Sequence, residues 1–241
     1  MIRTLFIIFW TVILTGFFGV IVILTSFVST GGETPHKVAR IWAKCILAAS
    51  NIKVTVKGLA NLNPTGSYIY MPNHVSNFDI PVLQAYLPVQ FRWLAKAELF
   101  KIPIFGYAMK RAGYISINRF DRKSAIQSLN KASETIRNGT SVIIFPEGTR
   151  SHNQNIQSFK KGGFVLAVDS GVPIIPVIIH GTWTIMQKKH VLVRPGNVIL
   201  EIKKPINTLD YTRKTKDDLM EKVRNIILES YEKNKKNEML C

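Results

Sequence analysis

The segment NHVSNFD, at residues 73–79, places a histidine and an aspartate close together just after an apolar run. His74 and Asp79 are five positions apart, which corresponds to a rotation of about 140° around an α-helix. One straight helix therefore cannot aim both side chains at one point. They converge if His74 lies on a loop and Asp79 begins a helix, where Asp is a good N-cap and Pro81 is tolerated in the first turn. The carboxylate would then orient the imidazole as in a general-base dyad, and the alternative is a pair that only caps a turn.

A second group of polar residues follows the apolar run SVIIF, at residues 141–145. Pro146 ends this predicted strand, Gly148 permits a tight turn, and Glu147 and Arg150 remain at the rim of the sheet. A guanidinium fork binds phosphate through two parallel hydrogen bonds, and a glycine lets backbone N–H groups approach an anion. The segment PEGTR therefore predicts an anion site. The alternative is a Glu147–Arg150 salt bridge that closes the turn.

Two further segments extend this pattern. The run GYISI is followed by Asn118 and Arg119, and two arginines after two strands form a plausible clamp for one phosphate. The run GVPIIPVIIHG, at residues 171–181, carries two prolines in an apolar stretch. Because proline removes a donor from the hydrogen-bond ladder, this run predicts an edge strand that lines an apolar site, with ordinary core as the alternative.

Strand and helix patterns alternate along the rest of the chain. Continuous apolar runs such as SVIIF are typical of strands buried on both faces, and the alternation indicates an α/β domain. We therefore expect a mixed, mostly parallel sheet covered by helices, with functional groups beyond the carboxyl ends of its strands. The predicted strands are SYIYM, FRWLA, GYISI, SVIIF, PIIPVII, VLV and NVILEI. The clearest predicted helices are DRKSAIQSLNKASETIRN, SFKKGGFVLAVDS and TKDDLMEKVRNIILESYEK.

The N-terminal region differs from the rest of the chain. Residues 4–32 contain no charged side chain, and about 20 apolar residues suffice to cross a bilayer core. A cleaved signal is the alternative, but the run exceeds the usual h-region. Residues 35–50 then predict a basic amphipathic helix with Trp42, which suits an anionic headgroup region; the alternative is that it packs on the globular domain. We divide the chain into membrane-anchoring helices at 1–50 and a catalytic domain at 51–241.

The charge balance narrows the class of partner. The chain of 241 residues has a formal net charge of +17, although 46% of its residues are hydrophobic. Nucleic acid, an anionic membrane surface and an acidic carrier or substrate all fit this charge. If the apolar segment spans the cell membrane, the Lys/Arg excess after it predicts a body on the cytoplasmic face. A re-entrant pair of helices in one leaflet is the alternative. Two cysteines and five scattered histidines indicate neither a disulfide framework nor a zinc site.

Taken in order, four of these segments resemble the motifs of the glycerophosphate/lysophosphatidate acyltransferase family, its bacterial members in particular. NHVSNFD resembles the first block, GYISINR the second, FPEGTR the third and VPIIPV the fourth. The intervening LAKAELFKIPIFG and FKKGGFVLA are also similar to that family. The resemblance covers about residues 50–205, and the first 35 residues and the tail are less similar.

The resemblance implies transfer of a fatty acyl group from a thioester to the sn-2 hydroxyl of lysophosphatidic acid, giving phosphatidic acid for phospholipid biosynthesis. His74 would remove the hydroxyl proton, and Asp79 would hold the imidazole in the required tautomer. Arg119 and Arg150, with the turn at Gly148 and Thr149, would hold the acceptor phosphate. The donor would be an acyl carrier protein or coenzyme A thioester, and no metal or bound cofactor is expected.

Four other residues receive weaker predictions. Glu147 would orient Arg150 or the glycerol rather than touch phosphate, since two anions repel. Asn73 would shape the turn that presents His74. Lys96 and Lys160 are candidates for contact with the substrate or the oxyanion, against the alternative of plain surface lysines.

Three other functions stay open at this point. A same-family enzyme could use glycerol 3-phosphate, another lysophospholipid or an amino-acid-based lipid as acceptor. A membrane-bound binder of anionic lipid explains the charge and the anchor but gives His74 and Asp79 no chemical task. A nucleic-acid binder explains neither the apolar N-terminus nor FPEGTR, so we expect no nucleic-acid partner.

Overall fold

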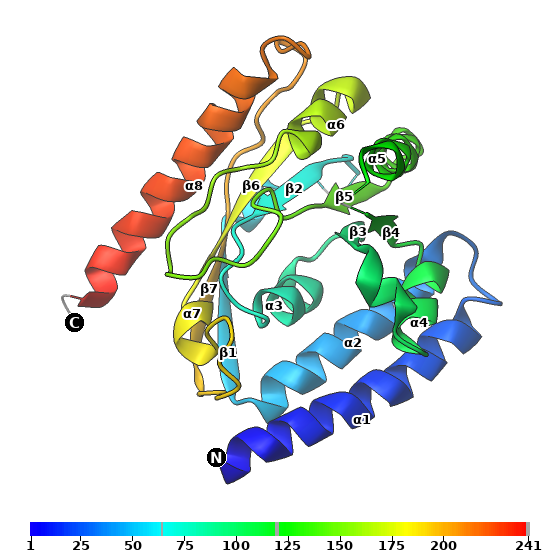
Figure 1. The fold of residues 1–241 in the computed structure, drawn as a ribbon, viewed down its shortest axis with the longest axis vertical. Coiled ribbons are helices and arrows are strands. Elements are labelled where there is room, and N and C mark those ends of the chain that lie inside the picture. Colours follow the sequence, from blue (N-terminus) through cyan, green and yellow to red (C-terminus); the bar gives the residue numbers. More distant parts are fainter. Residues whose placement is uncertain (64, 119–120, 240–241) are drawn as a thin grey trace.

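The computed structural model describes residues 1–63, 65–118 and 121–239. In this part of the chain a seven-stranded sheet has the strand order β1-β7-β6-β2-β5-β3-β4 (Figure 1). Every neighbouring pair is parallel except β6 and β7, which are antiparallel. The predicted mixed, mostly parallel sheet is therefore confirmed. The strands are β1 (Ile52–Lys57), β2 (Ile69–Pro72), β3 (Phe91–Lys96), β4 (Ile115–Ile117), β5 (Ser141–Ile143), β6 (Ile174–His180) and β7 (Gly196–Ile202).

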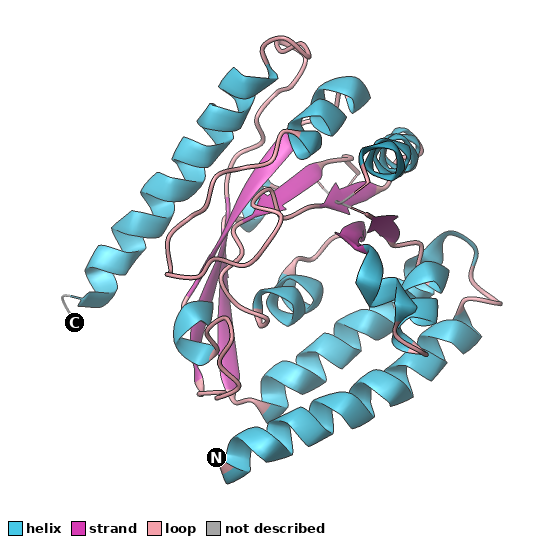
Figure 2. Ribbon diagram, viewed as in Figure 1, coloured by secondary structure: helices cyan, strands magenta, loops and turns pink. Residues whose placement is uncertain are grey.

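Helices cover both faces of this sheet (Figure 2). They are α1 (Ile2–Thr25), α2 (Glu33–Ala49), α3 (Asp79–Tyr86), α4 (Phe105–Arg111), α5 (Arg122–Arg137), α6 (Gly162–Ser170), α7 (Thr182–Ile185) and α8 (Lys216–Met239). Short 3-10 turns lie at Thr30–Gly32, Leu59–Asn61 and Ala97–Lys101. The three helices expected from the clearest patterns are present as α5, α6 and α8. The α6 helix ends at Gly171, whose φ of +68° is the left-handed conformation that favours glycine at a helix end.

Two hydrophobic cores lie on opposite faces of the sheet. One contains side chains of α1, α2 and α3 together with Trp93 of β3, and the other contains side chains of α6 and α8 together with Leu94 of β3. Ile69 and Met71 of β2 likewise point to one core and Tyr70 to the other. This alternation is the period-two geometry of a strand buried on both faces.

The predicted position of the two-proline strand is wrong. β6 is the third strand of seven and all its residues are buried, so it is a central strand and ordinary core. Pro176 is tolerated because its missing N–H falls between two paired stretches. Ile174 bridges Ile206, and regular pairing with β7 begins only at Val177.

Two strand assignments also differ from the sequence patterns. The run VLV, at residues 191–193, lies in a loop, where Val191 is exposed and Val193 is buried. The β1 strand was not expected, although its sequence IKVTVK alternates apolar and polar residues. As an edge strand it buries mainly one face, so its pattern is weaker than that of the continuous apolar runs.

The N-terminal helices pack along the domain as an antiparallel pair. α1 contacts α2 and α4, and α2 contacts α3 (Figure 1). The predicted basic face of α2 is partly wrong, because Arg40 is half-buried and donates from Nη2 to the carbonyl oxygens of Leu87 and Val89 at 3.0 Å. Ile41 of the same helix is apolar and yet exposed. The geometry of α2 thus favours the alternative that it packs on the globular domain.

The outer side of α1 is apolar and exposed. In the described residues, α1 is the single helix that is long and apolar enough to cross a membrane by length and composition. Its buried residues are Thr4, Ile7, Leu14, Gly19 and Val22. Its exposed large hydrophobic residues are Ile2, Leu5, Phe6, Ile8, Phe9, Trp10, Val12, Ile13, Phe17, Val20 and Leu24. The division of the chain near residue 50 stays a prediction.

Candidate active site

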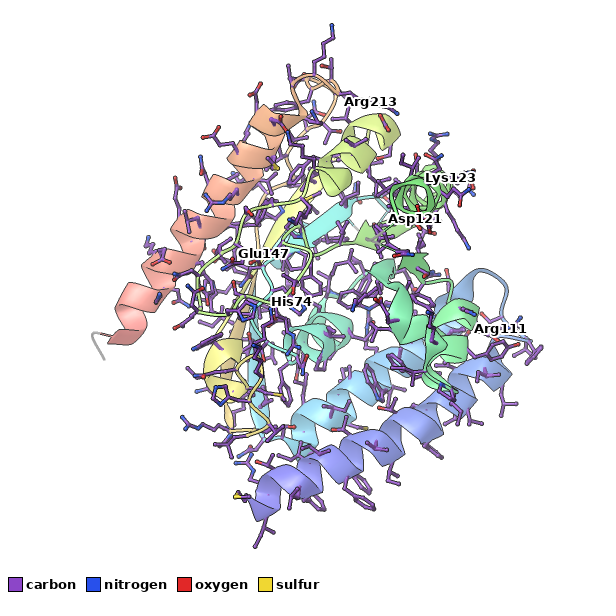
Figure 3. All side chains as sticks on the ribbon, in the orientation of Figure 1. His74, Arg111, Asp121, Lys123, Glu147 and Arg213 are labelled. Carbon is purple, nitrogen blue, oxygen red and sulfur yellow. The ribbon has the colours of Figure 1, made fainter. Side chains whose placement is uncertain are left out.

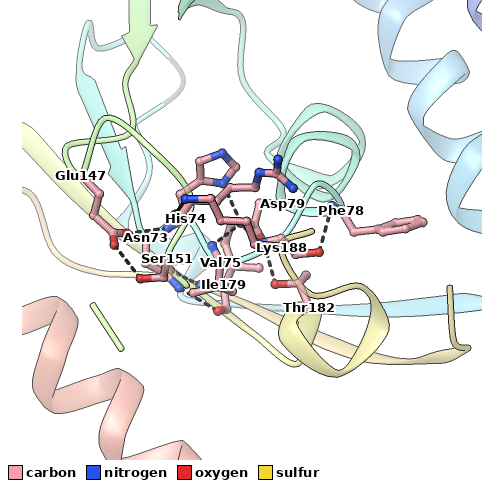
Figure 4. Close-up of polar contacts among 12 residues, drawn as sticks. Asn73, His74, Val75, Phe78, Asp79, Glu147, Ser151, Ile179, Thr182 and Lys188 are labelled. Atoms are coloured by element: carbon pink, nitrogen blue, oxygen red, sulfur yellow. Dashed lines mark hydrogen bonds and ion pairs between the residues drawn. The ribbon is translucent and has the colours of Figure 1, made fainter. Parts of the chain in front are cut away.

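His74 and Asp79 meet across the loop that joins β2 to α3. The Nδ1 atom of His74 lies 2.8 Å from Oδ2 of Asp79 (Figure 4). Helix α3 begins at Asp79, preceded by Phe78 as its N-cap, so the expected cap position is one residue off. The expected bend is present, with a histidine on the loop and an aspartate at the start of a helix.

The carboxylate of Asp79 is fully buried and accepts hydrogen bonds on both oxygens. Oδ2 accepts from the backbone N–H groups of Val75 and Ser76 at 2.7 and 2.8 Å, and Oδ1 accepts from the hydroxyl of Thr182 at 2.5 Å. With Nδ1 of His74 donating to this carboxylate, the neutral imidazole keeps its lone pair on Nε2. Among the described residues Nε2 has no hydrogen-bond partner, and the His74 ring lines a cavity.

Asn73 fixes the start of this loop to the sheet. Its side chain accepts from the N–H of Ile179 at 2.7 Å and donates to the carbonyl of Ile179 at 3.1 Å. It thereby continues the β2–β6 pairing beyond Pro72, as a strand residue would. Asn73 is buried and does not line the cavity, so it acts on His74 through the loop rather than by direct contact.

The loop after β5 holds His74 from a second side. The Phe145 ring stacks on the His74 ring, with centroids 3.8 Å apart and planes inclined by 14°. Oε1 of Glu147 accepts the backbone N–H of His74 at 2.7 Å. Oε2 accepts from the N–H of Gln157 at 2.8 Å. It also accepts from the hydroxyl of Ser151 at 3.3 Å (Figure 4). Gly148 adopts a φ of +73°, consistent with the expected tight turn.

Glu147 therefore has a partner that the sequence did not indicate. It forms no ion pair with Arg150 in the described residues; instead its carboxyl group orients the backbone of His74. The side chain is 1% exposed, and burial raises the pKa of Glu147 to about 7, while the N–H groups of Gln157 and His74 act in the opposite direction. The salt-bridge alternative for this turn is thus wrong.

One cavity of about 990 Å³ brings most of the predicted site residues together. Its polar part is lined by His74, Lys96, Glu147, Gly148, Thr149, Arg150 and Lys160. Lys96 forms an exposed ion pair with Glu98 at 3.2 Å, and Lys160 is exposed at the start of α6. Figure 3 shows His74 and Glu147 together near the centre of the molecule. Arg119 lies outside the described residues, so the second half of the predicted phosphate clamp keeps the status of a prediction.

The remaining lining of the cavity is mostly apolar, and its polar members include Thr15, Asn77 and Gln84. It extends from His74 past Trp93 and Tyr114 to Trp42 of α2 and to residues of α1 such as Phe18. No residue of the run 171–181 lines it, which corrects the expectation that this strand forms a wall of the site. A long hydrocarbon chain fits a space of this volume and character better than a polar ligand does.

Lys188 is a site residue that the sequence did not reveal. Its Nζ donates to the carbonyl of Arg150 at 2.5 Å, to His152 Nε2 at 2.8 Å and to the hydroxyl of Thr149 at 3.4 Å. Desolvation, followed by the charges of Arg150 and Lys189, lowers the pKa of Lys188. In the sequence, Lys188-Lys189 looks like any solvated basic pair, so no signal could have identified it.

Comparison with known proteins shows the family to which the chain is similar. The acyltransferase family model matches residues 53–180, more than half of the chain. A chloroplastic 1-acyl-sn-glycerol-3-phosphate acyltransferase of Arabidopsis thaliana is 37% identical over 174 residues, covering 71% of this chain and 48% of that protein. The 1-acyl-sn-glycerol-3-phosphate acyltransferase of Saccharomyces cerevisiae is 33% identical over 222 residues, covering 89% of this chain and 72% of that protein. The chain spans about half the length of the plant relative.

The fold is also similar to that of a solved structure. The crystal structure of the 1-acyl-sn-glycerophosphate (LPA) acyltransferase from Thermotoga maritima matches with a TM-score of 0.83 and 28% sequence identity. The match covers 97% of this chain and 95% of that chain, so it includes the two N-terminal helices. On the extent of the family match and of these relatives, the chain belongs to the acyltransferase family.

Proposed function

We propose that the protein is a 1-acyl-sn-glycerol-3-phosphate O-acyltransferase, which moves a fatty acyl group from a thioester to the sn-2 hydroxyl of lysophosphatidic acid. The observation that carries this proposal is the position of His74. Its ring contacts a buried carboxylate through Nδ1 and lines a cavity that also contains Arg150, Lys160 and a long apolar extension. The names of the two relatives and of the solved structure support the same reaction.

The proposed reaction uses His74 as a general base. Nε2 takes the proton of the sn-2 hydroxyl while the hydroxyl oxygen attacks the thioester carbonyl carbon. The C–S bond of the tetrahedral intermediate then breaks, and the imidazolium returns the proton to the leaving thiolate. Asp79 holds the tautomer and stabilises the imidazolium, and a positioned base of this kind contributes about 10²–10⁴ in rate. The products are phosphatidic acid and a free thiol.

The cations at the cavity are proposed to hold the acceptor phosphate. Arg150 and Lys160 line the cavity with His74, and Lys188 fixes the backbone carbonyl of Arg150 at 2.5 Å. Arg119 would complete the clamp, as the resemblance implies. The glycine at position 148 gives the phosphate access to backbone N–H groups in this turn. The reaction requires no metal or bound cofactor.

The enzyme is proposed to work at the cell membrane with its catalytic domain on the cytoplasmic face. The apolar outer side of α1 supports contact with the bilayer, and the net charge of +17 suits an anionic surface. The acyl donor is an acyl carrier protein or coenzyme A thioester, and both carriers are anionic. The apolar part of the cavity would receive the fatty acyl chain.

The test is acyl transfer by the purified full-length protein in detergent or vesicles. Acyl carrier protein and coenzyme A thioesters serve as donors, with lysophosphatidic acid, glycerol 3-phosphate and a phosphate-free lysolipid as acceptors. The proposal predicts phosphatidic acid from lysophosphatidic acid and little product from the other two. If product forms only from another acceptor, the proposed acyl-transfer reaction would stand, but lysophosphatidic acid would be the wrong acceptor.

A further inference from the structure

The cavity at His74 extends onto both faces of the sheet. Lining residues of β3 and of the segment just after β5 alternate between the two hydrophobic cores: Trp93 and Phe145 pack with the α1–α3 core, whereas Leu94 and Ile144 belong to the core of α6 and α8. The cavity therefore passes over the carboxyl ends of these strands. We therefore treat the cavity as two arms, one on each face of the sheet.

The first arm lies under α1 and α2 and is described above. The second arm lies between α5 and α6, on the opposite face of the sheet. Its lining residues are Ile117, Ala125, Leu129, Ile144, Gly162 and Gly163.

A separate polar pocket of about 250 Å³ lies beyond Leu129, along the same two helices. Leu129 lines both the second arm and this pocket. The pocket contains two guanidinium groups and one carboxylate. Arg213 is paired with Asp169 through two contacts of 2.7 Å, whereas Arg137 donates to Ser133 Oγ at 3.0 Å and has no carboxylate partner among the described residues. The pocket thus has an excess of positive charge at Arg137.

We propose that the second arm of the cavity binds the pantetheine part of the donor thioester. Arg137 would then bind the phosphate to which the pantetheine is attached in the carrier. This proposal rests on the proposed function, since it assigns a site to the donor's carrier. An extended pantetheine arm is about as long as four extended residues, or roughly 15 Å. From Ala125 to Arg137 the helix α5 rises about 18 Å, at about 1.5 Å for each of twelve steps. The rise of α5 from Ala125, which lines the second arm, to Arg137 is therefore comparable with the length of the pantetheine arm.

The location favours a water-soluble carrier over a lipid chain. The second arm is on the sheet face away from α1, and Figure 3 shows Arg213 at the end of the molecule opposite α1. A carrier that approaches from water reaches this end without crossing the membrane side. A lipid chain would have to leave the apolar region under α1 and end beside Arg137, Ser133 and Asp169. Burial of a hydrocarbon chain among these polar groups gives no hydrophobic stabilisation.

The test measures binding of three unreactive hexadecyl thioethers by calorimetry: those of coenzyme A, of pantetheine and of N-acetylcysteamine. All carry the same chain, and only the first has the phosphate. Ala125→Trp, which fills the second arm, should weaken binding of the coenzyme A and pantetheine compounds at least tenfold, about 1.4 kcal/mol, and leave the N-acetylcysteamine compound unchanged. The matched control is Ile126→Trp, because Ile126 lies on α5 with its side chain exposed.

A second variant tests the phosphate. Arg137→Gln should weaken binding of the coenzyme A compound and leave the pantetheine compound unchanged, with Lys131→Gln on the same helix as control. Equal weakening of all three compounds by Ala125→Trp, or no more weakening than with Ile126→Trp, would overturn the proposal. Binding does not require turnover, so a protein that binds as predicted but transfers no acyl group would refute the proposed function and leave this site standing.

Discussion

Thr182 donates its hydroxyl hydrogen to Oδ1 of Asp79 at 2.5 Å, although the two residues are 103 positions apart in the chain. Both side chains are fully buried. Thr182 follows β6, so the central strand of the sheet fixes the far oxygen of the carboxylate that holds His74. The dyad is thus positioned by the sheet as well as by its own loop.

Removing this hydroxyl should therefore lower turnover. Thr182→Val keeps the shape of the side chain but leaves Oδ1 of Asp79 without its donor. A hydrogen bond to a charged group contributes about 1.5–3 kcal/mol, so we expect a fall in kcat of roughly tenfold or more and a fall in the free energy of unfolding of that order. The measurement is kcat and urea unfolding of both variants. Thr182→Ser, which retains the donor, should stay close to wild type, and equal loss in both variants would contradict this role.

Glu147 should make stability depend on pH near neutrality. Burial raises its pKa to about 7 from an ordinary value of 4.5, so the folded protein keeps this proton where the unfolded chain has lost it. The contribution to stability is complete below pH 4.5, falls as pH rises between 4.5 and about 7, and is flat above that. The fall amounts to about 3 kcal/mol in total.

The measurement is the urea unfolding free energy at several pH values from 4.5 to 8. Wild type should lose stability over this range relative to Glu147→Gln, which cannot ionise. Parallel curves for the two proteins would show that Glu147 does not titrate with a raised pKa.

Lys188 is predicted to act on the acceptor through the loop that contains Arg150. Its Nζ contacts the Arg150 carbonyl and the Thr149 hydroxyl, so Lys188→Gln removes both a charge and a support for this loop. We expect KM for lysophosphatidic acid to rise roughly tenfold with a smaller change in kcat. The neighbouring Lys189→Gln, with an exposed side chain, is the matched control. A change in kcat alone, or the same change in the control, would argue against a part in phosphate binding.

The apolar arm under α2 is predicted to set the preference for acyl-chain length. Ala39 lines this arm, and Ala39→Phe would shorten it. Loss of contact with about four methylenes costs roughly 3 kcal/mol, so kcat/KM for a sixteen-carbon donor should fall at least tenfold relative to a twelve-carbon donor. Ala48→Phe, on the exposed side of α2, is the control. An equal fall in kcat/KM for both donors would show that the acyl chain does not bind in this arm.

Local sequence was sufficient for some of these relationships. The contact between His74 and Asp79 follows from a short loop and a helix start, both visible in seven residues. The mostly parallel sheet follows from continuous apolar runs that alternate with helix patterns. The tight turn at Gly148 likewise depends on one glycine and its neighbours.

Other relationships depend on tertiary pairing and could not be read in this way. Glu147 bonds to the backbone of His74 across 73 positions, and a backbone N–H carries no signal in the sequence. Pro176 suggested an edge strand, since proline lacks a backbone donor. Only the assembled sheet shows that the missing N–H lies between the Ile174–Ile206 bridge and the pairing with β7. Lys188 reaches Arg150 from a loop without periodicity.

The most direct measurement is phosphatidic acid formation from lysophosphatidic acid and a thioester donor by wild type and His74→Ala. The His190→Ala protein, changed at an exposed loop histidine, is the control. The account predicts that His74→Ala folds and binds donor like wild type, while kcat falls by about 10²–10⁴ and the control stays unchanged. Phosphatidic acid formed by His74→Ala at the wild-type rate would show that His74 is not the base, and would contradict the proposed mechanism at its centre.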